Sequence, residues 1–326
     1  MKRVLAAILV LTATACGGGA KPATSSSALT IAVIPKGTSH TFWQSIHAGA
    51  NRAGKELGAE IIWRGPLRED DRDSQVSEME TFISRGVSGI TIAPLDESAL
   101  KGPVDEAIAH KIPVVIFDSG LKGDNFVSFV ATDNEKGGAL GGERLVEVLH
   151  GNGKVLLLRY AEGHDSTTKR EEGFLTAMKA HPGIQVVSSN QYVGTDVEEA
   201  YKRIESILSG YKKPDGSLSV DGIFLVNESS SFAAMRVLQD NGWAGKLKFV
   251  GFDSSDNLVK ALEARMMDGL VVQDPVRMGY LAVKTLVAHI KGEPVEKRID
   301  TGVHVATPDN MKQPEINALL HPELAK

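Results

Sequence analysis

Polar side chains that can form hydrogen bonds follow the apolar segments of this sequence. Asp118 and Asp253 each come directly after a run of apolar residues, and Asn227 and Gln273 end two others. Carboxylates and amides accept and donate directional hydrogen bonds, so a set of them suits a ligand that is rich in hydroxyl groups. The aromatic pair Phe42–Trp43 would add flat apolar area beside them. This combination favours the binding of a polyol.

Catalysis is the alternative use of the same groups, because Asp118 and Asp253 could act as a general acid and base. The sequence has no Gly-x-Ser-x-Gly turn, so a serine hydrolase would lack its nucleophile. Of its nine histidines, only His40 and His47 could share a helical face, and no carboxylate completes a metal-binding pattern with them. We therefore expect a binding protein that is not an enzyme and holds no cofactor or metal.

Two further motifs receive a structural interpretation. The glycine-rich stretch 137–142 lacks the Lys-Ser/Thr ending of a phosphate-binding loop, so it predicts close helix packing. The charged run 68–73, which includes Glu69, predicts a solvated helix start.

Apolar strands alternate with amphipathic helical patterns from Leu29 onward. Near-continuous apolar strands are typical of parallel sheets covered on both faces, and the alternation indicates βαβ units. The series exceeds the size of one typical sheet, so we expect an α/β protein with two lobes. The expected strands are 29–34, 61–63, 90–93, 114–117, 155–158, 222–226, 249–252 and 270–272.

Composition limits the function classes. The length of 326 residues agrees with two domains, and the net charge of −5 disfavours a nucleic-acid binder. One cysteine excludes an intramolecular disulfide and any multi-cysteine zinc site. We expect a monomer.

The first residues predict export. A basic start at Lys2 and Arg3 precedes a short apolar run, as in a signal peptide. Small residues before Cys16 resemble the bacterial lipobox, except that Ala13 stands where Leu is usual. The resemblance implies a lipoprotein signal peptide over 1–16, lipid attachment at Cys16, and a flexible linker over 17–28. The alternative is an ordinary signal peptide that is cleaved near Ala15.

Several short motifs, in this order and spacing, resemble the periplasmic sugar-binding proteins of ABC importers, of the ribose-binding (type I) class. The resemblance implies two Rossmann-like lobes with parallel sheets, joined by a hinge that the chain crosses three times. It implies an N-terminal lobe of 29–132 plus 274–301 and a C-terminal lobe of 133–273 plus 302–326. The motifs are Phe42-Trp43, Ile92-Ala93-Pro94, Ile112–Asp118, Ala131–Asn134, Arg170–Phe174, Asn227-Glu228 and Val250–Asp253.

The resemblance also implies ligand-binding residues. Phe42 and Trp43 match the family's aromatic pair, and either Arg170 or Thr168 matches its arginine. His40 stands where ribose binders have Asn. The matched carboxylates and amides are Asp118, Asn227, Asp253 and Gln273.

Departures from the ribose pattern point to another ligand. Ser119 stands where ribose binders have Arg, and a hydroxyl does not replace a guanidinium fork. The neighbourhoods of Lys36 and Arg64 resemble the rhamnose-type and furanosyl quorum-signal receptors, which implies that Lys36 contacts the ligand. The family implies delivery to an ABC permease from the periplasm or cell surface, with the membrane reached only through the lipid anchor. The alternatives are a ligand sensor that serves a chemoreceptor or kinase, and a furanosyl quorum-signal receptor.

Overall fold

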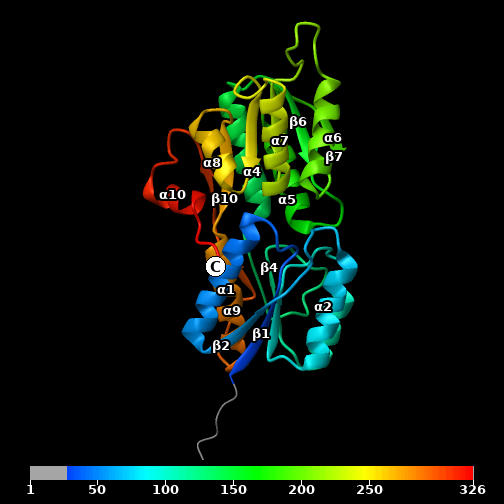
Figure 1. Cartoon of the computed structure of the whole chain (residues 1–326), viewed down its shortest axis with the longest axis vertical. Coiled ribbons are helices and arrows are strands. Elements are labelled where there is room, and N and C mark those ends of the chain that lie inside the picture. Colours follow the sequence, from blue (N-terminus) through cyan, green and yellow to red (C-terminus); the bar gives the residue numbers. More distant parts are fainter. Residues whose placement is uncertain (1–27, 326) are drawn as a thin grey trace, which may run out of the picture.

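The computed structural model describes residues 28–325, which form two lobes stacked along the long axis of the molecule (Figure 1). The signal peptide 1–16, Cys16 and the linker as far as Ser27 lie outside the described residues. Each lobe is built on a six-stranded sheet with helices on both faces. The α/β class with two Rossmann-like lobes, expected from the alternation of strands and helices, is confirmed.

The lobe that begins the chain, here the N-lobe, has a fully parallel sheet of order β11-β5-β4-β3-β1-β2. Its strands are β1 (Leu29–Ile34), β2 (Ala59–Trp63), β3 (Gly89–Ile92), β4 (Val114–Phe117), β5 (Ser128–Ala131) and β11 (Arg298–Asp300). Its helices are α1 (Thr41–Leu57), α2 (Arg72–Arg85), α3 (Lys101–Ala109) and α9 (Pro275–Ile290).

The second lobe, here the C-lobe, has the strand order β12-β10-β9-β8-β6-β7. Its sheet departs from the expected all-parallel arrangement at one edge, where β12 runs antiparallel to β10. Its strands are β6 (Gly153–Arg159), β7 (Ile184–Tyr192), β8 (Gly222–Leu225), β9 (Lys248–Phe252), β10 (Gly269–Gln273) and β12 (Val303–Ala306). Its helices are α4 (Asn134–Val148), α5 (Asp165–Ala180), α6 (Val197–Ser209), α7 (Glu228–Asp240), α8 (Asp256–Glu263) and α10 (Pro314–Leu320).

The chain passes between the two sheets at three places. Strand β5 lies in the N-lobe sheet, whereas the next helix, α4, packs on α5 of the C-lobe. Strand β10 lies in the C-lobe sheet, whereas α9 packs on α1 of the N-lobe. Strands β11 and β12 belong to different sheets, with Thr301 and Gly302 between them. These three crossings form the hinge that joins the lobes.

The glycine-rich stretch is a helix-packing surface, as its sequence predicted. A Cβ atom at Gly138 would lie 1.8 Å from the Arg170 carbonyl oxygen, and one at Gly173 would lie 1.9 Å from that of Glu135. Helices α4 and α5 can approach this closely only because both positions lack a side chain. The approach fixes Arg170 beside the start of α4.

Four strands were not predicted from the sequence: β5, β7, β11 and β12. Strand β7 lies at a sheet edge and is rich in Ser, Asn and Gln, so it has no apolar run. Strands β11 and β12 are short, only partly buried and interrupted by polar residues, so they have no continuous apolar run like that of the predicted four-residue strands. Within residues 28–325, no helix combines the length and apolar character that crossing a membrane requires.

Candidate ligand-binding site

The candidate site is a cavity between the lobes, at the carboxyl ends of their strands. The space inside it that the centre of a water molecule can occupy is about 30 Å³, and every one of the nine residues assigned to the ligand from the sequence lines it. Ligands bind at this end of the strands in open α/β sheets, because the loops there converge. The lining residues are Lys36, His40, Phe42, Trp43, Glu69, Asp118, Ser166, Thr167, Arg170, Asn227, Glu228, Ser229, Asp253 and Gln273.

On the N-lobe side, a buried ion pair joins Lys36 and Asp118. Lys36 follows β1, Asp118 follows β4, and Lys36 Nζ lies 3.0 Å from Asp118 Oδ2. Lys36 also donates a hydrogen bond to Ser166 Oγ of the C-lobe, at 2.9 Å. Both charged side chains are almost fully buried, so each one depends on the other for compensation.

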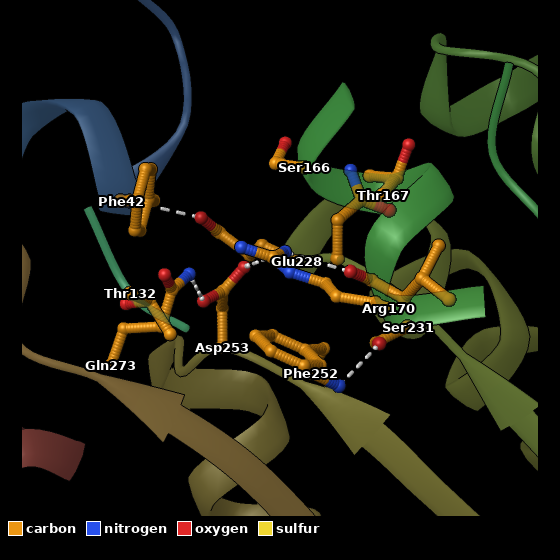
Figure 2. Close-up of polar contacts among 12 residues, drawn as sticks. Phe42, Thr132, Ser166, Thr167, Arg170, Glu228, Ser231, Phe252, Asp253 and Gln273 are labelled. Carbon is orange, nitrogen blue, oxygen red and sulfur yellow. Dashed lines mark hydrogen bonds and ion pairs between the residues drawn. The ribbon is translucent and has the colours of Figure 1, made fainter. Parts of the chain in front are cut away.

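On the C-lobe side, Asp253 is the corresponding carboxylate. Its Oδ1 accepts a hydrogen bond from Gln273 Nε2 at 2.7 Å, and its Oδ2 lies 3.8 Å from Arg170 Nη1 (Figure 2). Burial raises the pKa of Asp253 to about 7, and the nearby Arg170 opposes this shift. Within the described part of the chain, Gln273 Oε1 is a buried acceptor without a donor. These groups can accept hydrogen bonds from a ligand.

Arg170, one of the two candidates for the arginine position of the family, lies in the cavity wall. Its Nε donates to Asn134 Oδ1 and its Nη1 donates to the Val226 carbonyl oxygen, each at 2.8 Å. Its guanidinium lies over the Phe252 ring, 3.9 Å from the centroid (Figure 2). Thr167 also lines the cavity, whereas Thr168 does not.

The aromatic pair stands at the start of α1. The Phe42 and Trp43 rings meet edge to face, with centroids 5.0 Å apart and an interplanar angle of 81°. The Phe42 amide donates to Glu228 Oε2 of the C-lobe at 3.0 Å (Figure 2). His40 is the N-cap residue of α1, and its Nε2 lies 4.0 Å from Glu69 Oε1.

Five lining residues were not assigned to the ligand from the sequence. The prediction that the charged run is a solvated helix start is wrong for Glu69, which is buried and turned toward Trp43. It holds for Asp70 and Asp73, which are exposed, and α2 begins just after Asp71. Glu228 and Ser229 directly follow Asn227 at a strand end, so a wider search of that turn could have found them. The remaining two are Ser166 and Thr167 in the first turn of α5.

The lobes are closed on each other in this structure. The Phe42 and Glu228 contact and the Lys36 and Ser166 contact both join the lobes across the cavity. At the rim, the Gly120 amide donates to Asp165 Oδ2 at 2.9 Å. A ligand in the cavity would be enclosed by both lobes, as hinged binding proteins require.

The site suits recognition of hydroxyl groups. Its carboxylate and amide oxygens outnumber its two cations, and aromatic rings form part of its wall. Among residues 28–325, no group of three or more His, Cys, Asp or Glu side chains is arranged to hold a metal ion. The arrangement can therefore bind and orient a donor-rich ligand through hydrogen bonds.

Known proteins share this architecture. The ribose import binding protein of Haemophilus influenzae is 30% identical over 298 residues, covering 91% of this chain and 98% of that protein. A carbohydrate transporter solute-binding protein from Agrobacterium radiobacter, solved with D-arabinose, has 33% identity and a TM-score of 0.85, covering 91% of this chain and all of that one. A solute-binding protein from Agrobacterium vitis with bound D-fucose has 34% identity and a TM-score of 0.83, covering 89% and 99%.

A family model provides the assignment. The model described as "Periplasmic binding protein domain" matches residues 31–294, which include the cavity and most of both lobes. The two α/β lobes agree with this match, because solved type I periplasmic binding proteins have the same architecture. The chain belongs to the periplasmic binding protein domain family, with the type I fold.

Proposed function

We propose that this protein is an extracytoplasmic solute-binding protein that encloses a sugar or sugar-like polyol between its lobes and delivers it to an ABC permease. The observation that carries the proposal is the pairing of Asp118 and Asp253. One carboxylate comes from each lobe, both line the same buried cavity, and each has a cation beside it. Ionised acceptors of this kind form strong hydrogen bonds with hydroxyl groups.

The proposal that the ligand is a sugar rests on the residues that line the cavity and on the ligands of similar proteins. Proteins that are 30–34% identical include one named for ribose import and others solved with D-arabinose or D-fucose. Ser119 stands where ribose binders have an arginine, and this difference weighs against ribose itself as the ligand. The resemblance to rhamnose-type and furanosyl quorum-signal receptors stays a prediction, which the ion pair of Lys36 with Asp118 favours.

We also propose that the protein is lipid-anchored through Cys16 at the periplasmic or cell surface and works as a monomer without a cofactor. Mass spectrometry of the mature chain would test the anchor. A diacylglyceryl Cys16 supports it, and Cys16→Ser should then release the protein from the membrane fraction. A free Cys16 thiol on a chain cleaved near Ala15 would replace the anchor with an ordinary signal peptide.

A thermal-shift screen tests the proposed function. The panel is D-ribose, D-allose, D-arabinose, D-fucose, L-rhamnose and xylitol. A ligand at a hundred times its Kd adds about 2.7 kcal/mol to the free energy of unfolding. We expect at least one sugar to raise the melting temperature clearly. Recovery of that sugar unchanged after incubation with the protein would argue against turnover. A panel that leaves the melting temperature unmoved would contradict sugar binding.

The choice between transport and sensing needs a partner assay. Uptake of the identified sugar, lost when this chain is deleted and restored by its expression, supports delivery to a permease. Unimpaired uptake with a lost transcriptional or chemotactic response would instead assign the protein to a sensor system.

A further inference from the structure

Glu69 connects the two lobes through the two oxygens of one carboxylate. It lies in the segment between β2 and α2 of the N-lobe and is 8% exposed. Its Oε1 accepts a hydrogen bond from Trp43 Nε1 at 2.8 Å, within the same lobe. Its Oε2 accepts one from the Tyr160 hydroxyl at 3.2 Å, and Tyr160 follows β6 of the C-lobe.

The first contact fixes an aromatic wall of the cavity. Trp43 is 2% exposed, so its indole N–H has no access to bulk water and needs an acceptor within the protein. Glu69 supplies that acceptor, and Phe42 supports the ring from the side. The carboxylate therefore determines the plane that Trp43 presents to the cavity.

The second contact depends on closure. Tyr160 is buried, and its burial and the nearby Glu69 raise the pKa of its hydroxyl, which stays protonated and donates. Ser229 and Asn227 lie beside the same hydroxyl, so Tyr160 is fixed within its own lobe. Opening of the lobes would separate Tyr160 from Glu69 because they belong to different lobes. The bond between them can form only in the closed state.

We propose that Glu69 is a positioning residue for the ligand: it orients the Trp43 ring and links that ring, through Tyr160, to closure of the lobes. This inference rests on the proposed function, since it takes the cavity as the sugar site. Tyr160 does not line the cavity, so its effect on affinity would pass through the lining residues beside its hydroxyl, which are Glu69, Asn227 and Ser229. Coupling between substitutions at Tyr160 and Glu69 isolates the route through Glu69. Loss of the Tyr160 bond should accelerate dissociation and leave association unchanged, because the bond forms after encounter.

A double-mutant cycle on sugar affinity tests this link. The variants are Glu69→Gln, Tyr160→Phe and the double mutant, titrated with the member of the sugar panel that wild type binds most tightly. Loss of a hydrogen bond to a charged group predicts about tenfold weaker binding for each single variant. The double mutant should bind no more weakly than Glu69→Gln alone, because the bond that Tyr160→Phe removes is already disturbed in Glu69→Gln.

A pair with the same chemistry inside one lobe serves as the control. The Tyr280 hydroxyl donates to Glu56 at 2.9 Å, and both residues belong to N-lobe helices. Glu56→Gln and Tyr280→Phe should leave sugar affinity unchanged. Additive losses of about a hundredfold in the double mutant at Glu69 and Tyr160 would overturn the proposal and leave Glu69 as a local support of Trp43.

Two results separate the remaining outcomes. If Glu69→Gln does not fold, Tyr160→Phe alone decides: a faster dissociation rate with an unchanged ligand-free melting temperature supports the link, and unchanged sugar affinity overturns it. If wild type binds no sugar of the panel, the proposed function fails and this inference fails with it. Sugar binding by wild type with an additive cycle overturns only the role of Glu69.

Discussion

Asp118 and Asp253 occupy equivalent positions in the two lobes. Each directly follows a buried central strand, and each has a backbone in the left-handed region, with φ of 60° and 65°. Few residues other than glycine adopt this conformation, although Asp tolerates it better than most. Such local strain is found at functional sites, where the surrounding structure enforces it. The conformation directs both carboxylates from opposite lobes toward one cavity.

Replacement of Asp118 should abolish the thermal shift caused by the sugar. Asp118→Ala removes an acceptor from the cavity and leaves Lys36, which is 2% exposed, without its carboxylate partner. The stabilisation of about 2.7 kcal/mol at a hundred times the wild-type Kd should fall to nearly zero. The ligand-free melt should stay cooperative, because an open cleft hydrates Lys36. Asp124→Ala, at an exposed aspartate of the same lobe, is the control. A full shift in Asp118→Ala would exclude Asp118 from the site.

In the ligand-free protein, the closed form should lose stability relative to the open form as the pH rises toward neutrality. Burial in the closed form raises the pKa of Asp253 from 3.8 to about 7, so the closed form keeps a proton that the hydrated carboxylate of the open form has released. The closed form therefore loses stability from about pH 4 through about pH 7, because the state that binds more protons is disfavoured as the pH rises. Small-angle X-ray scattering of ligand-free wild type and Asp253→Asn over this range measures the effect. We expect the radius of gyration to grow with pH in wild type and to change less in Asp253→Asn, and equal slopes would contradict the assignment.

Arginine at position 170 should not be replaceable by lysine. Arg170→Lys loses the fork that reaches both Asn134 Oδ1 and the Val226 carbonyl oxygen, and a buried acceptor without a donor costs about 1–3 kcal/mol. We expect a lower melting temperature and at least about tenfold weaker sugar binding. Calorimetric titration checks the affinity. Arg265→Lys, at an exposed ion pair with Asp309, should change neither property. Wild-type affinity in Arg170→Lys would place the guanidinium outside the ligand contacts.

The close approach of α4 and α5 should not tolerate a methyl group at its centre. Gly138→Ala would place a Cβ atom 1.8 Å from the Arg170 carbonyl oxygen, which forces the two helices apart. We expect a loss of about 3 kcal/mol in the free energy of unfolding, measured with urea. Gly102→Ala is the matched control, because nothing lies within 4 Å of the added atom. Equal stability of the two variants would show that the contact is not tight in solution.

The strands were predictable from the sequence where their residues are fully buried. The predicted strands 29–34 and 114–117 coincide with β1 and β4, and the other six predicted strands differ from the observed ones by one or two residues at their ends. Gly58 ends α1 with φ of 68°, the left-handed conformation that glycine adopts readily at the end of a helix. Periodicity fails where packing is one-sided or brief, as in the polar edge strand β7 and the three-residue β11.

The site was predictable where residues follow a strand. Lys36, Asp118, Asn227 and Asp253 were located by this rule together with the family resemblance, and the structure brings them to one cavity. Glu69 could not be found in this way, since its acidic neighbours are exposed and local sequence does not distinguish it from them. Its burial depends on Tyr160, which is distant in sequence and belongs to the other lobe. A contact that forms only when the two lobes close leaves no pattern in the neighbouring sequence.

Small-angle X-ray scattering with and without sugar tests the central claim most directly, namely that the lobes close on a ligand in this cavity. The sugar is the panel member with the largest thermal shift, at a concentration that saturates the shift. We predict that sugar reduces the radius of gyration and gives a profile that the closed structure fits, with no such change in Asp118→Ala. Identical scattering of wild type with and without a saturating sugar would contradict the account.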